Sequence, residues 1–205
     1  NFQDATFQLG QRTEIDFDIS GGGDKVNYYF GLGYLNQDGI VRGTNYKNYS
    51  LLYKGNFKLS DSWTLNAKAS LSIRDANAPN NYEWVLARSV LLPPTYRKYY
   101  ENGLPAPGEG ISSFRNRLHE IHYKTKYNDL NVYRTTFQLG GVSDIMPGLT
   151  FSPSAYYFST EGVENYFEAY NETVTNRPAS ARHNLDRHLQ FDGLLNYDLS
   201  FNNKH

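Results

Sequence analysis

Few residues of the chain have the types and the spacing that catalysis or metal binding requires. His119, Glu120 and His122 are potential metal ligands, but they lack the spacing of a His-Glu-x-x-His motif and no third ligand is placed. We therefore interpret this segment as part of a solvated loop, and we expect neither a metal nor another cofactor. The five histidines show no pairing with a nucleophile that would indicate hydrolysis.

Motifs of covalent catalysis and of nucleotide binding are also missing from the sequence. The chain has no cysteine, which excludes disulfides, thiol catalysis and cysteine metal sites. It has no Gly-x-Ser-x-Gly motif and no P-loop. The run Gly21-Gly22-Gly23 precedes a strand pattern and not a helix, so it is no phosphate cradle. We predict that the protein is not an enzyme.

Aromatic side chains are the remaining group with binding chemistry. The chain holds 18 Tyr and 2 Trp, and aromatic residues make up 16% of it. Trp84, Tyr96, Tyr99 and Tyr100 fall in one long connection, where their rings can stack on the flat apolar faces of sugars. The alternative is that they pack within the loop, because aromatic rings bury large areas wherever they can. We take these four residues as the candidate ligand contacts.

The segments around these residues have a period of two. From 64 to 74, Leu65, Ala67, Ala69, Leu71 and Ile73 alternate with polar residues, which places the two sets on opposite faces of a strand. The same pattern predicts about seven strands, near 9–19, 26–34, 49–59, 64–74, 133–139, 149–157 and 188–199. Pro153 removes a hydrogen-bond donor from the sixth. A short helix is expected over 81–92, with Trp84, Val85, Arg88, Leu91 and Leu92 on one face and Pro93-Pro94 at its end.

The connections between these strands alternate strictly in length. Short ones rich in turn-forming residues fall at 21–25, 60–62, 145–148 and 201–204, and long ones at 36–48, 76–131 and 162–186. In an up-and-down barrel every second connection lies at the same end, and outer-membrane barrels combine short periplasmic turns with long extracellular loops. The pattern therefore predicts an all-β fold of antiparallel up-and-down strands in a large transmembrane β-barrel. Tyr28, Tyr34, Tyr49, Phe57, Trp63, Tyr157 and Tyr197 would form its aromatic girdles.

Composition agrees with this prediction. The mean hydropathy is −0.65 and no stretch of 18 apolar residues occurs, which excludes a transmembrane helix but not barrel strands, whose hydropathy averages out. The formal net charge is −1, so no basic excess indicates a nucleic-acid partner. Seven strands cannot close a membrane barrel, because an open edge would leave backbone groups unpaired in lipid. We therefore expect 1–205 to be part of a longer barrel protein, with a long extracellular loop at 76–131.

One run of residues resembles a known family. Ser20-Gly21-Gly22-Gly23-Asp24-Lys25 leads to Tyr28, and Gly33-Tyr34 continues to Gln37-Asp38-Gly39-Ile40-Val41 and Tyr46-Lys47-Asn48-Tyr49. This order resembles SusC/RagA-like TonB-dependent transporters of Bacteroidetes. Weaker matches follow at Pro93-Pro94-Thr95-Tyr96, Pro147-Gly148-Leu149 and Leu195-Asn196-Tyr197, whereas Phe2 and Asn48 depart from the Trp and Arg usual in the family.

The resemblance implies TonB-dependent import of a nutrient across the bacterial outer membrane, with an oligosaccharide as the expected substrate and a peptide as the alternative. It also implies a SusD-like surface lipoprotein, the TonB complex and outer-membrane lipid as partners. The plug and the TonB-contacting segment of such a protein are not found in this sequence. Two other classes stay open: a soluble β-sandwich carbohydrate-binding module, and a barrel enzyme.

Overall fold

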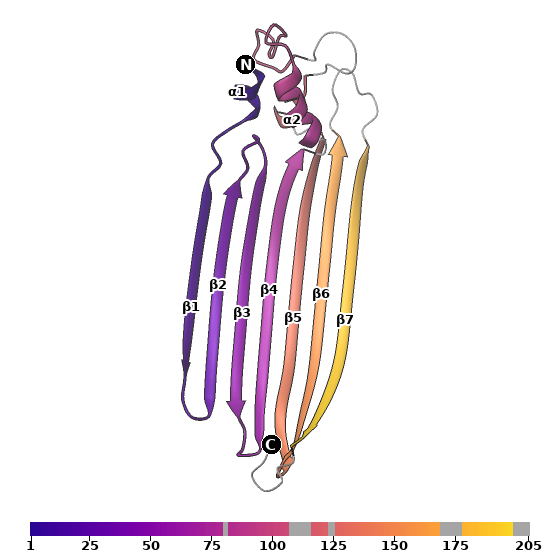
Figure 1. The fold of residues 1–205 in the computed structure, drawn as a ribbon. Helices are drawn as coiled ribbons and strands as arrows, with labels where there is room; N and C mark the ends of the chain where they lie inside the picture. Colours follow the sequence, from indigo (N-terminus) through magenta and orange to yellow (C-terminus); the bar gives the residue numbers. More distant parts are fainter. Residues whose placement is uncertain (80–81, 107–115, 123–125, 169–177, 199–205) are drawn as a thin grey trace.

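One antiparallel sheet makes up most of the chain in the structure, a computed structural model that describes residues 1–79, 82–106, 116–122, 126–168 and 178–198. Its strands lie side by side in sequence order (Figure 1). They are β1 (Arg12–Gly22), β2 (Val26–Asp38), β3 (Asn45–Lys58), β4 (Trp63–Pro79), β5 (Lys126–Met146), β6 (Leu149–Glu168) and β7 (Ala179–Tyr197). The short connections lie at one end, here called the turn end, and the long ones at the other, the loop end (Figure 1).

Hydrophobic burial is confined to the loop end. The buried hydrophobic residues of the described chain are Phe2, Val41, Val85, Leu92, Ala106 and Leu118, and none of them lies in a strand. The strands instead expose large apolar side chains such as Phe17, Leu71 and Phe191. A β-sandwich needs two sheets packed face to face, whereas all described strands belong to one sheet. No second sheet among the described residues covers the apolar side chains of the strands, so whatever contacts them lies outside this chain.

The register shows that the strands are staggered. Ile15, Tyr34, Tyr49, Ile73 and Tyr133 lie in one hydrogen-bonded row across β1 to β5. Past this row, β1 continues for seven residues to Gly22 and β3 for nine to Lys58. β5 continues for thirteen to Met146, one of which is the extra residue of a bulge between Asp144 and Met146 and adds no length to the ladder. If the turns of a barrel lie at one height along its axis, this stagger requires the strands to tilt from the axis by about 40°. The angle follows from about 3.3 Å per residue along a strand and about 4.8 Å between strands. Closed barrels have tilts of this size.

The strands are longer than the alternation predicts. β4 runs to Pro79 and β5 begins at Lys126, so their connection spans 80–125 and not 76–131. The other long connections shorten in the same way, to 39–44 and 169–178. One predicted start was too early: Leu9 is fully exposed and precedes β1. The reason is that alternation marks only the part of a strand that has one apolar face, whereas the backbone ladder continues where both faces are polar.

Two local features adjust the sheet near the turn end. β6 continues through Pro153, but its pairing with β5 has a gap between Gly140↔Ser154 and Ser143↔Phe151, since proline cannot donate to the ladder. Pro147 and Gly148 connect β5 to β6, and Gly148 has φ +83°. Proline followed by a residue with positive φ is the pattern of a type II turn. The turn predicted at 145–148 is confirmed, and the one at 201–204 lies outside the described residues.

Three short helices cover the loop end: α1 (Phe2–Thr6), α2 (Tyr82–Leu91) and α3 (Leu118–His122). Phe2, Leu92 and Leu118 form a small core, against which Ala5, Tyr96 and Ile121 pack. Backbone hydrogen bonds attach the segment before β1 to the connection after β2: Gln8 N donates to Ile40 O at 2.8 Å and Arg42 N to Thr6 O at 2.9 Å. The loop end is thus a folded cap, built from segments far apart in the sequence.

Candidate functional site

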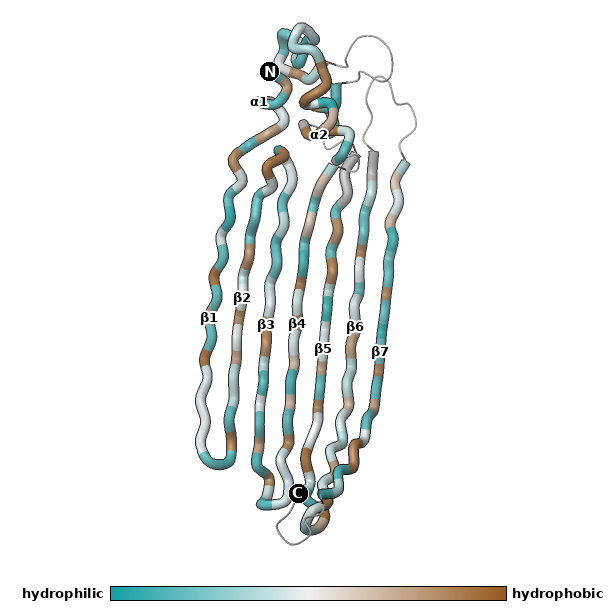
Figure 2. The backbone as a smooth tube through the Cα atoms, viewed as in Figure 1, coloured by the Kyte–Doolittle hydropathy of each residue, from teal (hydrophilic) through white to brown (hydrophobic). Residues whose placement is uncertain are grey.

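The two faces of the sheet differ in chemistry, and the difference follows the register. Apolar and polar residues alternate along the strands (Figure 2). On one side, here the apolar face, Phe17, Leu32, Leu51 and Leu71 occupy a single row across β1 to β4. Tyr34 and Tyr49 lie in the neighbouring row, with ring centroids 5.1 Å apart.

A sharp boundary limits the apolar face toward the loop end. The row just beyond Tyr34 and Tyr49 is polar on five successive strands: Thr13, Asn36, Lys47, Asp75 and Asn131. On β6 and β7 polar residues begin closer to the turn end, at Ser159 and Arg187, although Val163 and Leu185 are apolar residues beyond them. The apolar band therefore runs obliquely across the hydrogen-bonded rows. From β1 to β7 it shifts toward the turn end relative to these rows, and the turns shift in the same direction.

Aromatic residues border this band at both margins. Tyr34, Tyr49, Tyr133 and Tyr157 lie toward the loop end, and Tyr28, Phe57, Trp63, Phe151 and Tyr197 toward the turn end. On β4 the band extends from Ile73 to Trp63. Ten residues at a tilt of about 40° span roughly 25 Å, the height of the apolar band of outer-membrane barrels. The aromatic side chains are thus positioned as two girdles.

The opposite side, here the polar face, carries charged residues on several strands. Glu14, Asp16 and Asp18 follow one another along β1, and Arg12 pairs with Glu14 at 2.6 Å. Lysines and arginines occupy the middle of the sheet, at Lys54 on β3, Lys68 and Arg74 on β4, and Arg134 on β5. These charges would cost about 2–4 kcal/mol each for Arg or Lys against lipid, so this face suits water or polar protein.

The candidate ligand contacts are split between two positions at the loop end. Trp84 lies on α2 with half of its surface exposed, and the guanidinium carbon of Arg88 lies 5.1 Å from its ring centroid. Tyr99 and Tyr100 are also exposed, where a bridge between Tyr99 and Pro105 and a hydrogen bond from Tyr100 N to Leu104 O fold the segment back. Tyr96 packs against the core of Phe2, Leu92 and Leu118.

The predicted common face of the helix is wrong in detail. Val85, Ser89 and Leu92 are the buried positions, whereas Trp84 is 51% exposed and Leu91 61%. The two sets lie on neighbouring arcs of the helix, about 100° per residue apart. Periodicity cannot choose between such arcs when both contain apolar residues, and the contact with α1 makes the choice.

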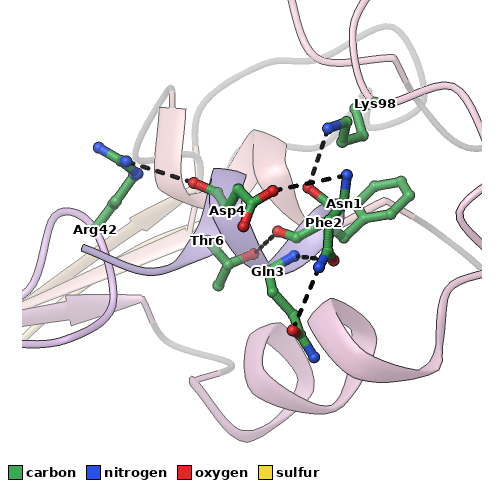
Figure 3. A network of polar contacts seen from close by, with 7 residues as sticks. All are labelled: Asn1, Phe2, Gln3, Asp4, Thr6, Arg42 and Lys98. Carbon is green, nitrogen blue, oxygen red and sulfur yellow. Dashed lines mark hydrogen bonds and ion pairs between the residues drawn. The ribbon is translucent and has the colours of Figure 1, made fainter. Parts of the chain in front are cut away.

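Hydrogen bonds hold this cap together around α1 (Figure 3). Lys98 Nζ donates to Asn1 O at 3.0 Å, and Arg42 Nη2 donates to Asp4 O at 3.4 Å. Buried Asn116 donates from Nδ2 to the carbonyls of Lys98 and Ala106, at 2.9 and 2.7 Å. The cap therefore fixes the backbone that carries Tyr99 and Tyr100.

The histidine segment gives no sign of a metal centre in the part of the chain that the structure describes. Glu120 is buried and pairs with Arg117 through Oε1 and Nη1, whereas the side chains of His119 and His122 lie outside the described residues. Within the described ranges no group of three or more His, Cys, Asp or Glu could hold a metal ion.

None of the helices in those ranges is long and apolar enough to span a membrane.

Comparisons with known proteins agree with this geometry. No family model matches the chain. It is 25% identical over 207 residues to the TonB-dependent receptor P39 of Formosa agariphila, which covers 99% of this chain and 19% of the receptor. The RagAB peptide importer in its "closed-closed" state superimposes with a TM-score of 0.81 at 17% identity, over 98% of this chain and 24% of that one. The chain folds as a segment of a TonB-dependent transporter barrel.

Two further RagAB structures show the same fold. The RagAB peptide transporter gives a TM-score of 0.81 at 18% identity over 99% of this chain, and the "open-open" importer gives 0.72 at 17% over 94%. The chain spans about a fifth of the length of the curated receptor and about a quarter of the RagAB chains. The predicted resemblance to SusC/RagA-like transporters and the all-β, up-and-down barrel fold are confirmed.

Proposed function

We propose that this segment belongs to an outer-membrane barrel that imports a nutrient with energy from the TonB complex, and that it is not an enzyme. The observation that carries the barrel assignment is the oblique apolar band on a single, staggered sheet, and the similarity to a TonB-dependent receptor supports the source of energy. A tilted barrel in a bilayer requires such a band, because its horizontal membrane margins cross the hydrogen-bonded rows at the tilt angle. In this arrangement the apolar face meets lipid and the polar face lines the interior, where larger transporters hold a plug.

The orientation of the two faces can be tested directly on the full-length protein in lipid. Nitroxide labels at Phe17 and Ala67, on the apolar face, should be quenched by lipid-soluble reagents. Labels at Asp16 and Asn66, on the polar face, should be shielded from them. The reverse pattern would contradict the register and with it the barrel proposal.

An oligosaccharide is the proposed substrate. The support comes from the resemblance of the sequence to SusC-like transporters and from the exposed rings of Trp84, Tyr99 and Tyr100 at the loop end. Tyr96 contributes less surface, because it packs against the core of the cap. We also propose a SusD-like lipoprotein on the cell surface as the partner that covers this end.

A peptide is the second candidate, since the structures of the same fold are described as peptide importers and transporters. Uptake of fluorescent oligosaccharides and fluorescent peptides by cells with and without the full-length protein separates the two. Loss of oligosaccharide uptake supports the first candidate, and loss of peptide uptake supports the second. If cells without the protein took up both substrates as before, the protein would not import them. If uptake persisted in cells without TonB, import would not depend on TonB.

A further inference from the structure

Two lysines face each other on the polar face, away from the loop end. Lys54 of β3 pairs directly with Lys68 of β4 in the register, and Gln138 of β5 is the next residue in the same row. Facing residues of antiparallel strands have Cβ atoms about 4.5–5.5 Å apart. Lys54 and Lys68 are among the residues that line an open hollow of about 760 Å³, and Asn56 and Asn66 line it as well.

Neither lysine has a counter-charge within the described ranges of the chain. Within those ranges Lys54 Nζ lies over the ring of Tyr29, 5.7 Å from its centroid. Asp192 is the acidic residue that lines the hollow, and both of its carboxylate oxygens accept hydrogen bonds from Gln190. Like charges directly opposite each other destabilise a sheet. An anion bound between the two ammonium groups would remove this repulsion.

A nearby lysine of the same face has the partner that these two lack. Lys58 Nζ lies 2.8 Å from Asp61 Oδ1, and its hydrogen bond and charge lower the pKa of the Asp61 carboxyl. Lys58 therefore serves as a matched control: a lysine on the same strand and face whose charge is already neutralised.

Amide groups around the pair extend the set of donors. Asn56 and Asn66 face each other in the next row, where Asn56 Nδ2 donates to Asn66 Oδ1. Gln138 follows Lys68 on the other side. Ammonium and amide N–H groups together suit a group that only accepts hydrogen bonds, and an ionised carboxylate is such a group.

We propose that Lys54 and Lys68 form a subsite that binds one carboxylate inside the barrel. The inference deepens the proposed function, because it takes the polar face as the barrel interior. The carboxylate can come from the protein's own polypeptide or from a solute in the lumen, and the chemistry of recognition is the same in both cases.

Cross-linking of the full-length protein in detergent tests the proposal and separates the two sources. A carbodiimide activates a carboxylate, and a neighbouring amine then displaces a urea to form an amide. Because no spacer is inserted, two side chains of one protein are joined only if they come into contact. An amide between Lys54 or Lys68 and an Asp or Glu of the same polypeptide assigns the carboxylate to the protein. Saturable coupling of added succinate to Lys54 and Lys68, but not to the exposed turn residue Lys25, assigns the subsite to a solute. An amide between Lys58 and Asp61, which lie 2.8 Å apart, is the positive control for the reaction. Absence of both products overturns the proposal.

The sign of a stability change gives a second readout. With a carboxylate bound, Lys54→Gln and Lys68→Gln should each lower the urea midpoint of the full-length protein, in the presence of succinate if a solute is the source. Without an anion, each substitution would relieve repulsion and leave the midpoint unchanged or raised, which would contradict the subsite. Lys58→Gln loses its ion pair with Asp61, so it shows the change in midpoint that follows when a lysine of this face loses a carboxylate partner. The nitroxide pattern tests the barrel itself, so either proposal can fail without the other.

Discussion

Gly148 occupies a position where the backbone conformation and the nearby backbone both disfavour any residue other than glycine. Its φ is +83°, and a Cβ added there would lie 2.5 Å from the backbone oxygen of Asp198. Side chains are strained at positive φ, and a backbone atom cannot move aside as a flexible side chain does. The glycine therefore fixes both the turn between β5 and β6 and the approach of β7 to that turn.

We predict that Gly148→Ala destabilises the full-length protein by about 1 kcal/mol or more, because the strained turn and the clash act together. Urea unfolding in lipid measures the effect. Gly23→Ala is the matched control, since an added Cβ meets nothing within 4 Å in that turn. Equal stability of the two variants would show that the turn adapts.

Trp84 is the candidate ligand contact with the most accessible ring. We predict that Trp84→Ala raises the substrate concentration for half-maximal uptake about fivefold, if stacking contributes about 1 kcal/mol. The fold should persist because the ring lies on the exposed side of α2. Val90→Ala removes an exposed apolar side chain from the same helix and should leave uptake unchanged. Unchanged uptake in Trp84→Ala would remove this residue from the binding surface.

At the scale of the strand, the two faces predict opposite tolerance to charge. Ala69 lies near the middle of the apolar band on β4, and its sequence neighbour Ser70 points to the polar face. We predict that Ala69→Arg costs about 2–4 kcal/mol of unfolding free energy, the cost of an arginine near the bilayer midplane. Ser70→Arg, on the same strand, should cost far less. Similar losses from both substitutions, measured by urea unfolding in lipid, would contradict the assignment of the faces.

The helical element shows a limit of sequence periodicity. The start, the end and the type of α2 could be predicted from the sequence, because Pro93-Pro94 ends the helix and its residues favour it. Its buried side could not, because Val85 and Trp84 lie on adjoining arcs and both arcs are apolar. The contact with α1, a segment about 80 residues earlier in the chain, decides which arc is covered.

For the whole molecule, the tilt of the strands decides which residues share a depth in the membrane. Leu71 and Ser159 lie in the same hydrogen-bonded row, two strands apart. We predict that a label at Ser159 lies about 6 Å nearer the loop-end membrane margin than a label at Leu71, as a tilt of about 40° requires. Depth-dependent quenching of single-cysteine labels measures this difference. Equal depths would mean untilted strands and would contradict a closed barrel.

The sequence by itself determined the features that depend on close neighbours in the chain. Alternation over a few residues placed Leu71 and Ser70 on opposite faces, and turn-forming residues marked the ends of the strands at the turn end. The alternation of short and long connections predicted the up-and-down order that the sheet has. These features are local because a strand's period and a turn's chemistry are set within two to four residues.

Tertiary structure decided everything that depends on register between distant segments. It set the extension of β4 and β5 beyond the apolar band, the oblique course of that band, and the core in which Phe2 meets Leu92 and Leu118. It also brought Lys54 opposite Lys68. The physical reason is that a strand's own sequence fixes which face a side chain occupies, whereas the pairing between strands fixes its neighbours and its depth.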